Sequence, residues 1–512
     1  MTRINTNVQS LIAQRVLGQN NFQLNTSLER LSTGLRINRG KDDPAGLIAS
    51  ENLRSEIRST NAAISNAERA DQVLNIAEGG LQEVSGLLVE LQGLLTSTAS
   101  KAGLSKEEQD ANQVQIDSIL QTIDRIAGQT NFQGVKLLNG NFDYQTSAVN
   151  ANVSQFQVNG AKFKGDSMNV DVNITTSAQR GQLFMDLGAT GSLDLNNTGA
   201  SGNVFTIEVS GALGSRQLQF SSGTSFAAIQ DAINTFSDVT GVVASAEGNG
   251  IKLLSSEFGS SNFVSLKVVN DGNVQGGGIN KYESGDANTL STDPNDITAF
   301  SAANNGVRDR GQDVVANING VAATANGRSI SVNSDMLDVR INLTEDSATQ
   351  LSNFTAFQIT GGGADFQLGS KVDIEGKVSL GISDVSSRKL GSIEDANNLG
   401  KFFNLSDLSS GRGLNVVDGD IGVAQEVVGK AINEVASQRG RLGAFQSNTI
   451  GATMRSLAIA VENTEAAQSV IRDADFASET AALTRSQILS QASINTLSLA
   501  NQAPQNALAL LG

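Results

Sequence analysis

The sequence contains no cysteine, no histidine and no tryptophan, and it contains only three prolines. Without thiol and imidazole groups, the chain lacks the side chains that most often serve as nucleophiles, general bases and zinc ligands. Disulfide bonds are excluded as well, but a chain of 512 residues can bury enough surface to fold without them. An enzyme built from this chain would have to rely on carboxylate, lysine, serine or tyrosine chemistry.

Long apolar runs are missing too. The N-terminal stretch MTRINTNVQSLIAQRV contains polar residues throughout and has no continuous apolar core. We therefore expect no cleaved secretory signal peptide. No run of about 18 apolar residues occurs, so we expect no membrane-spanning segment and no membrane partner.

Charge is distributed unevenly along the chain, whose net charge is −16. Residues 1–60 carry a net charge of +3, residues 425–512 carry −1, and the middle carries −18. The acidic middle argues against nucleic acid as a partner, because phosphate binding requires clustered lysine and arginine. Sixteen of the twenty phenylalanines lie between Phe142 and Phe403. The composition thus separates aliphatic, nearly neutral ends from a middle that contains aromatic cores.

The N-terminal part shows helical periodicity. The first 40 residues predict a helix that stops at Gly40, and Asp43 before Pro44 predicts the start of a second helix that continues to residue 98. Ser105 and Glu108 form a capping box for a third helix, which ends near Gly128. Apolar stripes with 4-3-4 spacing mark the first two helices: Leu24, Leu28, Leu31 and Leu35, then Val84, Leu88, Leu91 and Leu95.

The C-terminal part is also helical in pattern. Helix resumes at Asp420, residues 439–445 (RGRLGAF) indicate a loop, and a last helix is expected over about 479–501, before Pro504. Between the loop and the last helix a 4-3 alternation predicts a coiled-coil helix paired with helix 45–98. Its positions are Ile450, Met454, Leu457, Val461, Thr464, Gln468 and Ile471.

The middle predicts short strands. Residues 129–145 indicate a hairpin with its turn at Asn139-Gly140, and alternating strands follow as far as residue 176. Residues 190–345 contain further strand-like runs around one amphipathic helix through Phe226 and Ile233, with Thr224 as its cap. Residues 272–305 have little periodicity and indicate a loop.

Three constellations resemble chemical sites, and each has a simpler explanation. Asp42 and Asp43 precede Pro44 and are best explained as a capped helix start rather than an acid–base pair. Gly361-Gly362-Gly363 lacks the lysine and helix of a phosphate-binding loop and indicates a turn. The Asp418-Gly-Asp420 stretch lacks the spaced ligands of a calcium loop and indicates a helix cap. We therefore predict no catalytic, cofactor-binding or metal-binding residues.

The segments LSTGLRINRGKDDPAGLIASENL and ANQAPQNALALLG lie at opposite ends of the chain and resemble bacterial flagellin. The resemblance implies a mainly α fold with a β-rich insert, in which long antiparallel coiled-coil-like helices from both chain ends carry an α+β outer domain. It implies three domains, which are the terminal helices 1–44 with 472–512, a helical-bundle domain 45–174 with 346–471, and a variable outer domain 175–345.

This resemblance also implies a function. The chain would self-assemble into the flagellar filament outside the cell, after type III export without a cleaved signal peptide. Its partners would be further copies of itself, an export chaperone at the C-terminal helices, and the hook-associated junction and cap proteins. The assembly stripes would comprise Leu24, Leu28, Leu31, Leu35, Leu483, Ile494, Leu497 and Leu508.

One region departs from the family pattern. Flagellins that stimulate Toll-like receptor 5 carry a stretch resembling L-Q-R-V-R-E-L on the long helix, where this chain has LVELQGL at residues 88–94. Glu90 stands in place of an arginine and Gln115 in place of an acid on the next helix, whereas Leu94 keeps its family identity. Because glutamate reverses the charge of arginine, we expect weak or no activation of the receptor.

Three other interpretations remain open. A hook–filament junction protein of the same superfamily generally lacks the ending ANQAPQNALALLG. A secreted adhesin or effector with a coiled-coil stalk would not elongate filament fragments. An enzyme carried in the insert is known among flagellins as a metallopeptidase, and the absence of histidine argues against it here.

Overall fold

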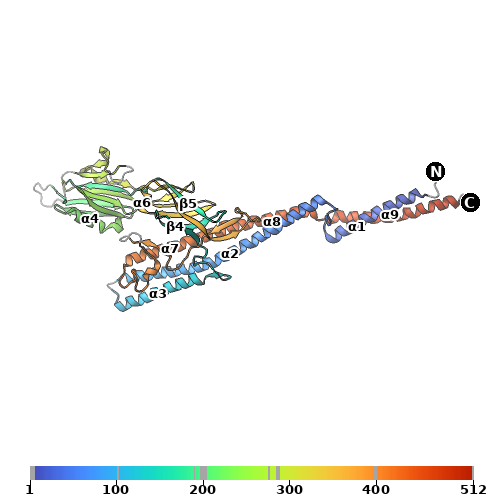
Figure 1. Cartoon of the computed structure of the whole chain (residues 1–512), viewed down its shortest axis with the longest axis horizontal. Coiled ribbons are helices and arrows are strands. Elements are labelled where there is room, and N and C mark those ends of the chain that lie inside the picture. The colour runs from blue at the N-terminus through green and yellow to red at the C-terminus, as the bar shows by residue number, and fades with distance from the viewer. Residues whose placement is uncertain are drawn as a thin grey trace. The chain divides into compact units, whose positions relative to one another are not determined.

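The computed structural model describes residues 6–100, 103–188, 191–195, 204–274, 277–283, 289–395 and 401–509. The chain is mainly helical at its ends and rich in strands in its middle, as expected (Figure 1). It divides into two compact units: Met1–Glu78, Phe366–Lys377 and Arg439–Gly512 form the first, and Gly79–Asp365 with Val378–Gln438 forms the second. No helix within the described residues is both long and apolar enough to cross a membrane.

In the first unit, helices α1 (Val8–Thr33) and α9 (Phe476–Ala509) pack side by side and antiparallel (Figure 1). The expected stop at Gly40 is wrong. Helix α1 ends at Thr33 because Gly34 adopts a left-handed conformation, φ +73°, and its N–H bonds the Arg30 carbonyl. The backbone of Leu35 then pairs with that of Asp473.

The expected end of the last helix before Pro504 is also wrong, because α9 continues to Ala509. A proline inside a helix removes one backbone hydrogen bond and costs about 3 kcal/mol. A helix of 34 residues retains the remaining hydrogen bonds on both sides of that position.

Helix α2 (Pro44–Thr98) begins where Asp43 and Pro44 predicted, and the Asp43 carboxylate accepts a hydrogen bond from the Gly46 N–H at 2.9 Å. Its N-terminal part pairs with α8 (Gly451–Arg472), as predicted. Glu51 contacts Arg472 at the end of α8, and two further polar contacts join α2 to the chain before α8 begins: Asp71 with Gln446, and Glu78 with Arg439. The predicted stripe of α8 is confirmed: Ile450 is buried, and Met454, Leu457, Val461, Thr464, Gln468 and Ile471 are half-buried.

The predicted loop at residues 439–445 is wrong. Helix α7 (Ile421–Ala444) continues through a π-helical turn, η4 (Phe445–Ile450), into α8. Gly440 and Gly443 each disfavour helix by about 1 kcal/mol relative to alanine. Burial of Leu442, which is 1% exposed, and the 2.8 Å contact of Arg439 with Glu78 oppose that cost.

In the second unit, the C-terminal part of α2 packs with α3 (Lys106–Gln129), whose Ser105–Glu108 capping box is present as predicted. The predicted α2 stripe of Val84, Leu88, Leu91 and Leu95 is fully buried. A Cβ atom at Gly80 would lie 2.7 Å from Leu138 Cδ1, so this glycine permits a close approach of chain segments. Strands β1 (Asn131–Phe132) and β2 (Val135–Lys136) turn at residues 133–134, not at the predicted Asn139-Gly140.

Two antiparallel sheets enclose what we call the first β core. One has the order β16 (Val321–Ala322), β15 (Val315–Ile318), β5 (Met168–Thr176), β20 (Asn353–Gly362) and β3 (Tyr144–Ser147). The other has the order β17 (Thr324–Asn326), β18 (Ser329–Asn333), β19 (Leu337–Leu343) and β4 (Val153–Ala161).

The second β core lies between two further sheets and helix α4 (Phe226–Asn234), which Ser225 caps instead of the expected Thr224. One sheet has the order β13 (Ile297–Thr298), β12 (Gly278–Lys281), β6 (Gln182–Asp186), β10 (Gly250–Ser255) and β9 (Val242–Glu247). The other has the order β14 (Val307–Arg310), β11 (Phe263–Asn270), β7 (Val204–Gly211) and β8 (Ser215–Ser221). Strands β12 and β13 fall within the stretch expected to be a loop.

The chain enters and leaves the second β core at one place, which we call the neck. Gln179 and Gln312 exchange two backbone hydrogen bonds there, each 2.9 Å long. Arg180 and Arg328 lie over the Phe258 ring at 4.6 and 5.4 Å from its centroid. Shorter elements complete the described fold: α5 (Ser237–Thr240), α6 (Glu345–Ala348), η1 (Pro294–Asp296), η2 (Phe300–Asn305), β21 (Ala364–Gln367), β22 (Lys377–Leu380), β23 (Ile393–Glu394), β24 (Phe402–Phe403) and η3 (Leu405–Leu408).

Candidate assembly surface

Small and polar side chains form the contact between α1 and α9, which we call the terminal seam. The best-buried side chains of the pair are Ser10, Ala13, Asn20 and Ser27 on α1 and Ser486 and Ser493 on α9. They recur at intervals of three or seven residues, which fits the spacing of a coiled-coil contact. Small residues allow the two helix backbones to approach closely, but they bury little apolar area.

Hydrogen bonds cross the terminal seam along its length. Asn20 Nδ2 donates to Ser493 Oγ at 2.8 Å and to the Leu489 carbonyl at 3.3 Å. Further contacts join Ser10 to Asn501 and Ser490 to Asn21, both at 2.8 Å, and Arg30 lies 3.8 Å from Glu479. Polar contacts thus join the described ends of the chain along the whole seam.

The predicted assembly residues fall into two groups. Leu24, Leu31, Leu483 and Leu497 are half-buried and extend the seam's three-and-four spacing. Leu28 and Ile494 face away from the seam and are 45% and 47% exposed. Leu35 is half-buried beyond the end of α1, and the side chain of Leu508 lies outside the described residues.

Large apolar side chains cover the rest of the terminal pair. Besides Leu28 and Ile494, the exposed ones on α1 are Val8, Leu11, Ile12, Val16 and Phe22, and those on α9 are Phe476, Ile488, Leu489 and Leu499. Reasoning from a single stripe missed Ile12, Val16, Phe22, Ile488, Leu489 and Leu499, because they do not fall on its face. A helix that is apolar on several faces was the available signal, since such a helix is normally buried on all sides. Contiguous exposed apolar surface marks an interaction site.

The expected receptor region lies on the surface of α2 and α3. Glu90 and Gln115 are exposed, and Leu94 is half-buried. Their apolar neighbours Val89 and Val114 are 58% and 67% exposed. The structure therefore leaves this region accessible in the single chain.

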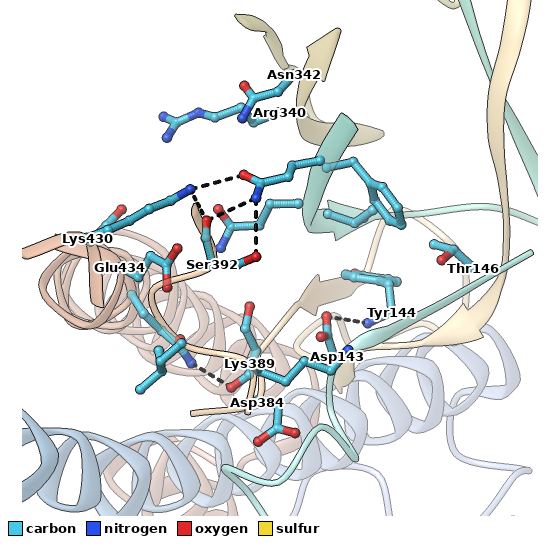
Figure 2. Close-up of a pocket in the computed structure, with 18 of the residues that line it drawn as sticks. Asp143, Tyr144, Thr146, Arg340, Asn342, Asp384, Lys389, Ser392, Lys430 and Glu434 are labelled. Atoms are coloured by element: carbon cyan, nitrogen blue, oxygen red, sulfur yellow. Dashed lines mark hydrogen bonds between the residues drawn. The ribbon is translucent and has the colours of Figure 1, made fainter. Parts of the chain in front are cut away.

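A cavity of about 680 Å³ lies between β4, the loop at residues 383–392 and α7 (Figure 2). Its charged lining balances Arg340, Lys389 and Lys430 against Asp143, Asp384 and Glu434. Figure 2 shows the Lys430 amino group directed toward Ser392, whose carbonyl accepts a hydrogen bond from it, while Gln155 Oε1 accepts another at 3.1 Å.

Burial determines the protonation behaviour of this cavity. It lowers the pKa of Lys430 and raises the pKa of Glu434, although the Gly391 N–H donates to the Glu434 carboxylate at 2.9 Å. The contacts of Lys430 and Glu434 connect α7 to Gln155 on β4 and to the loop at residues 383–392. The network contains no arrangement of nucleophile, base and oxyanion donors.

The constellations noted in the sequence have structural roles. The Asp42 carboxylate accepts the Arg39 N–H at 2.9 Å, and this bond lowers its pKa below the usual value. Gly362 and Gly363 adopt positive φ at the end of β20 and pack against Tyr144. Asp420 caps α7 by accepting the Gly422 N–H. Within the described residues, no group of three or more acidic side chains could hold a metal ion.

Comparisons with known proteins place both ends of the chain in one family. A family model described as the bacterial flagellin N-terminal helical region matches residues 4–143, and one described as the bacterial flagellin C-terminal helical region matches residues 425–511. Flagellin from Salmonella choleraesuis is 28% identical, and flagellin A from Helicobacter pylori is 27% identical. Each alignment covers 99% of both chains. A solved structure of FliC from Burkholderia pseudomallei covers 74% of this chain and 99% of that chain, at 14% identity and a TM-score of 0.24.

The family matches coincide with the helices that carry the terminal seam, and relatives named flagellin align with nearly the whole chain. This chain therefore belongs to the bacterial flagellin family and is a structural subunit of the bacterial flagellar filament.

Proposed function

We propose that the exposed apolar residues of α1 and α9 are the surface through which copies of this chain pack in the filament core. The observation that supports this most directly is that many large apolar side chains of the terminal pair are exposed outside its own seam. Each such side chain contributes about 1.5–3 kcal/mol when it is fully buried. Leu28 and Ile494 belong to this surface, whereas Leu24, Leu31, Leu483 and Leu497 help to close the pair.

A charge placed on the surface tests this role. Ile494→Glu should stop seeded elongation of filaments, because a buried unpaired carboxylate opposes packing. Leu213, which is 68% exposed between β7 and β8, provides the matched control, and Leu213→Glu should elongate like the parent chain. Light scattering after addition of filament fragments measures both. Normal elongation of the Ile494→Glu chain would refute the proposed surface.

We propose that the other partners of this chain also bind the exposed apolar surface of α1 and α9. An apolar pair of chain ends needs protection before export, and a chaperone that covers the C-terminal helices would supply it. The junction and cap proteins would meet the same ends in the filament. We also propose a purely structural role, in keeping with a family of structural filament subunits, and export that uses no cleaved signal peptide.

A second proposal concerns Toll-like receptor 5. We propose that this chain activates the receptor weakly or not at all, because exposed Glu90 and Gln115 replace the charges expected there. Loss of a desolvated charged hydrogen bond at an interface costs about 2–5 kcal/mol. Glu90→Arg should restore part of the response in a reporter-cell assay of monomeric protein, whereas Glu68→Arg, elsewhere on α2, should restore none. Full potency of the unmodified chain would contradict the proposal.

A further inference from the structure

The apolar residues of the terminal seam do not by themselves fix the register of α1 against α9. Leucines recur on both helices at multiples of seven residues, Leu17, Leu24 and Leu31 on α1 and Leu483 and Leu497 on α9. A slip of one heptad between such helices exchanges one leucine or serine for another and changes the apolar contact little. The observed register therefore needs another source of specificity.

Three hydrogen-bonded pairs supply that specificity. They are Ser10 with Asn501, Asn20 with Ser493, and Asn21 with Ser490, each at 2.8 Å. Asn20 and Ser493 are the central pair, and both are 8% exposed. A buried amide that loses its partner costs about 1–3 kcal/mol, so a register that separates these side chains is penalised.

Neither one-heptad slip preserves the three pairs. A slip in one direction leaves Asn20 opposite Ser486 but places Asn21 opposite Leu483 and Ser10 opposite Ile494. A slip in the other direction places Asn20 opposite Ala500 and Asn21 opposite Leu497. A single buried asparagine is known to select one register among helices that are otherwise compatible.

The observed register also aligns the exposed apolar residues of the two helices. It puts three pairs of them at the same levels along the terminal pair: Leu11 with Leu499, Val16 with Ile494, and Phe22 with Ile488. A one-heptad slip would bring alanine or glutamine to these levels, namely Ala492, Gln487 and Ala481. The opposite slip would bring three asparagines, Asn506, Asn501 and Asn495. Only the observed register gives three apolar bands.

We propose that the pairs Ser10–Asn501, Asn20–Ser493 and Asn21–Ser490 set the register of α1 and α9 and thereby align the apolar bands that neighbouring copies bury. The inference rests on the proposed function, assembly through the terminal helices. Asn20 is the central positioning residue, because its side chain is buried and contacts both a hydroxyl and a backbone carbonyl of α9.

The absence of cysteine allows the register to be read directly in filaments of the full chain. The double substitution Ser10→Cys with Asn501→Cys reports the observed register, because the native side-chain oxygens lie 2.8 Å apart. Ser10→Cys with Ile494→Cys reports the register slipped by seven residues. Each reporter chain is copolymerised with an excess of unmodified chain, oxidised, and scored by the fraction that forms an intramolecular disulfide.

Asn20→Leu should lower the ratio of observed to slipped cross-links by about tenfold or more, since it removes the central donor and adds a leucine to the seam. The reciprocal exchange Asn20→Ser with Ser493→Asn keeps one amide and one hydroxyl, and it should restore the ratio. Asn25 is exposed on α1, so Asn25→Leu serves as the control and should leave the ratio unchanged.

Two results would overturn the register proposal. One is an unchanged cross-link ratio in the Asn20→Leu chain, and the other is failure of the reciprocal exchange to restore the ratio. Both leave assembly through the terminal helices intact, whereas normal elongation of the Ile494→Glu chain refutes that assembly surface itself.

Discussion

The terminal helices and the second β core handle apolar side chains in opposite ways. In the second β core, Phe205, Ile207 and Leu266 are completely buried inside the chain. In the terminal pair, serine, alanine and asparagine are buried, while Leu11, Phe22 and Leu499 are 58–73% exposed. The middle of the chain therefore buries its large apolar side chains itself, whereas the ends leave theirs exposed and, in the assembly that we propose, bury them against neighbouring copies.

This difference separates folding from assembly. A helix gains little stability in water unless a packed surface supports it, and the small residues of the terminal seam provide little such surface. Contacts that repeat head to tail without closing generate a helical fibre. Changes at the ends should thus alter assembly, and changes in the middle should alter folding. Four predictions test this separation.

The largest effect is expected from removal of residues 472–512, which deletes α9 and its apolar surface. The truncated chain should remain soluble and keep both β cores folded, but it should not elongate filament fragments at all. Circular dichroism and light scattering measure the two properties. Filaments formed by the truncated chain would show that α9 is not required for assembly.

A substitution that creates a cavity in the second β core should lower the stability of this core and leave assembly unchanged. Phe205 is completely buried and lies 5.3 Å from Phe300, centroid to centroid, so Phe205→Ala should destabilise this core by about 3–5 kcal/mol. Elongation below the melting temperature should not change. Hydrogen exchange of residues 204–310 reports the loss, with exposed Leu213→Ala as the control. Loss of elongation would show that the two regions are coupled.

A smaller effect is expected at the cavity beside α7. Burial raises the pKa of Glu434 above 4.5, so the folded chain holds this proton more strongly than the unfolded chain. The resulting stability is present below the unfolded pKa and is lost as pH rises through the folded pKa. Glu434→Gln cannot ionise, so its melting temperature should exceed that of the parent at pH 7, and the difference should vanish near about pH 4. An equal difference at both values would exclude the ionisation of Glu434 as its cause.

The smallest effect on assembly is expected from deletion of residues 181–310, which contain the whole second β core and, from the first β core, only the side chain of Phe258. Gln179 and Gln312 are already paired at the neck, so a short turn can join the cut ends. A deletion of 175–345 would also remove β15, β18 and β19 and open the first β core. Elongation at the parent rate by the 181–310 deletion would show that the second β core is not needed for assembly. Failure to elongate would assign outer contacts to this region.

Periodic aliphatic residues and local caps were predictable from the sequence. Asp43, Ser105 and the stripes through Leu88 and Leu457 depend on neighbours within one helix, so a single sequence suffices to locate them. The helical structure of residues 439–445 was not predictable, because the local glycines indicate a loop. Burial of Leu442 and the contact of Arg439 with Glu78, far along the chain, oppose that tendency.

The residues of the terminal seam and of the assembly surface were also not predictable from the sequence. Serine and asparagine at helix positions normally indicate a solvated face, so Ser10 and Asn20 gave no signal that they are buried. The apolar residues on the other faces did not fit one stripe, and a search for a single period overlooked them. Their exposure becomes visible only when α9 is placed against α1.

The neck also has a mechanical consequence. Both chain segments that lead to the second β core pass through it. The backbone hydrogen bonds there include the two between Gln179 and Gln312 and one from the Gly259 N–H to the Gln179 carbonyl, and two guanidinium groups lie around Phe258. Viscous drag on the second β core of a rotating filament must pass through this narrow connection to reach the rest of the subunit. The strength of the neck under shear therefore limits how large a load the second β core can transmit before it peels away from the first.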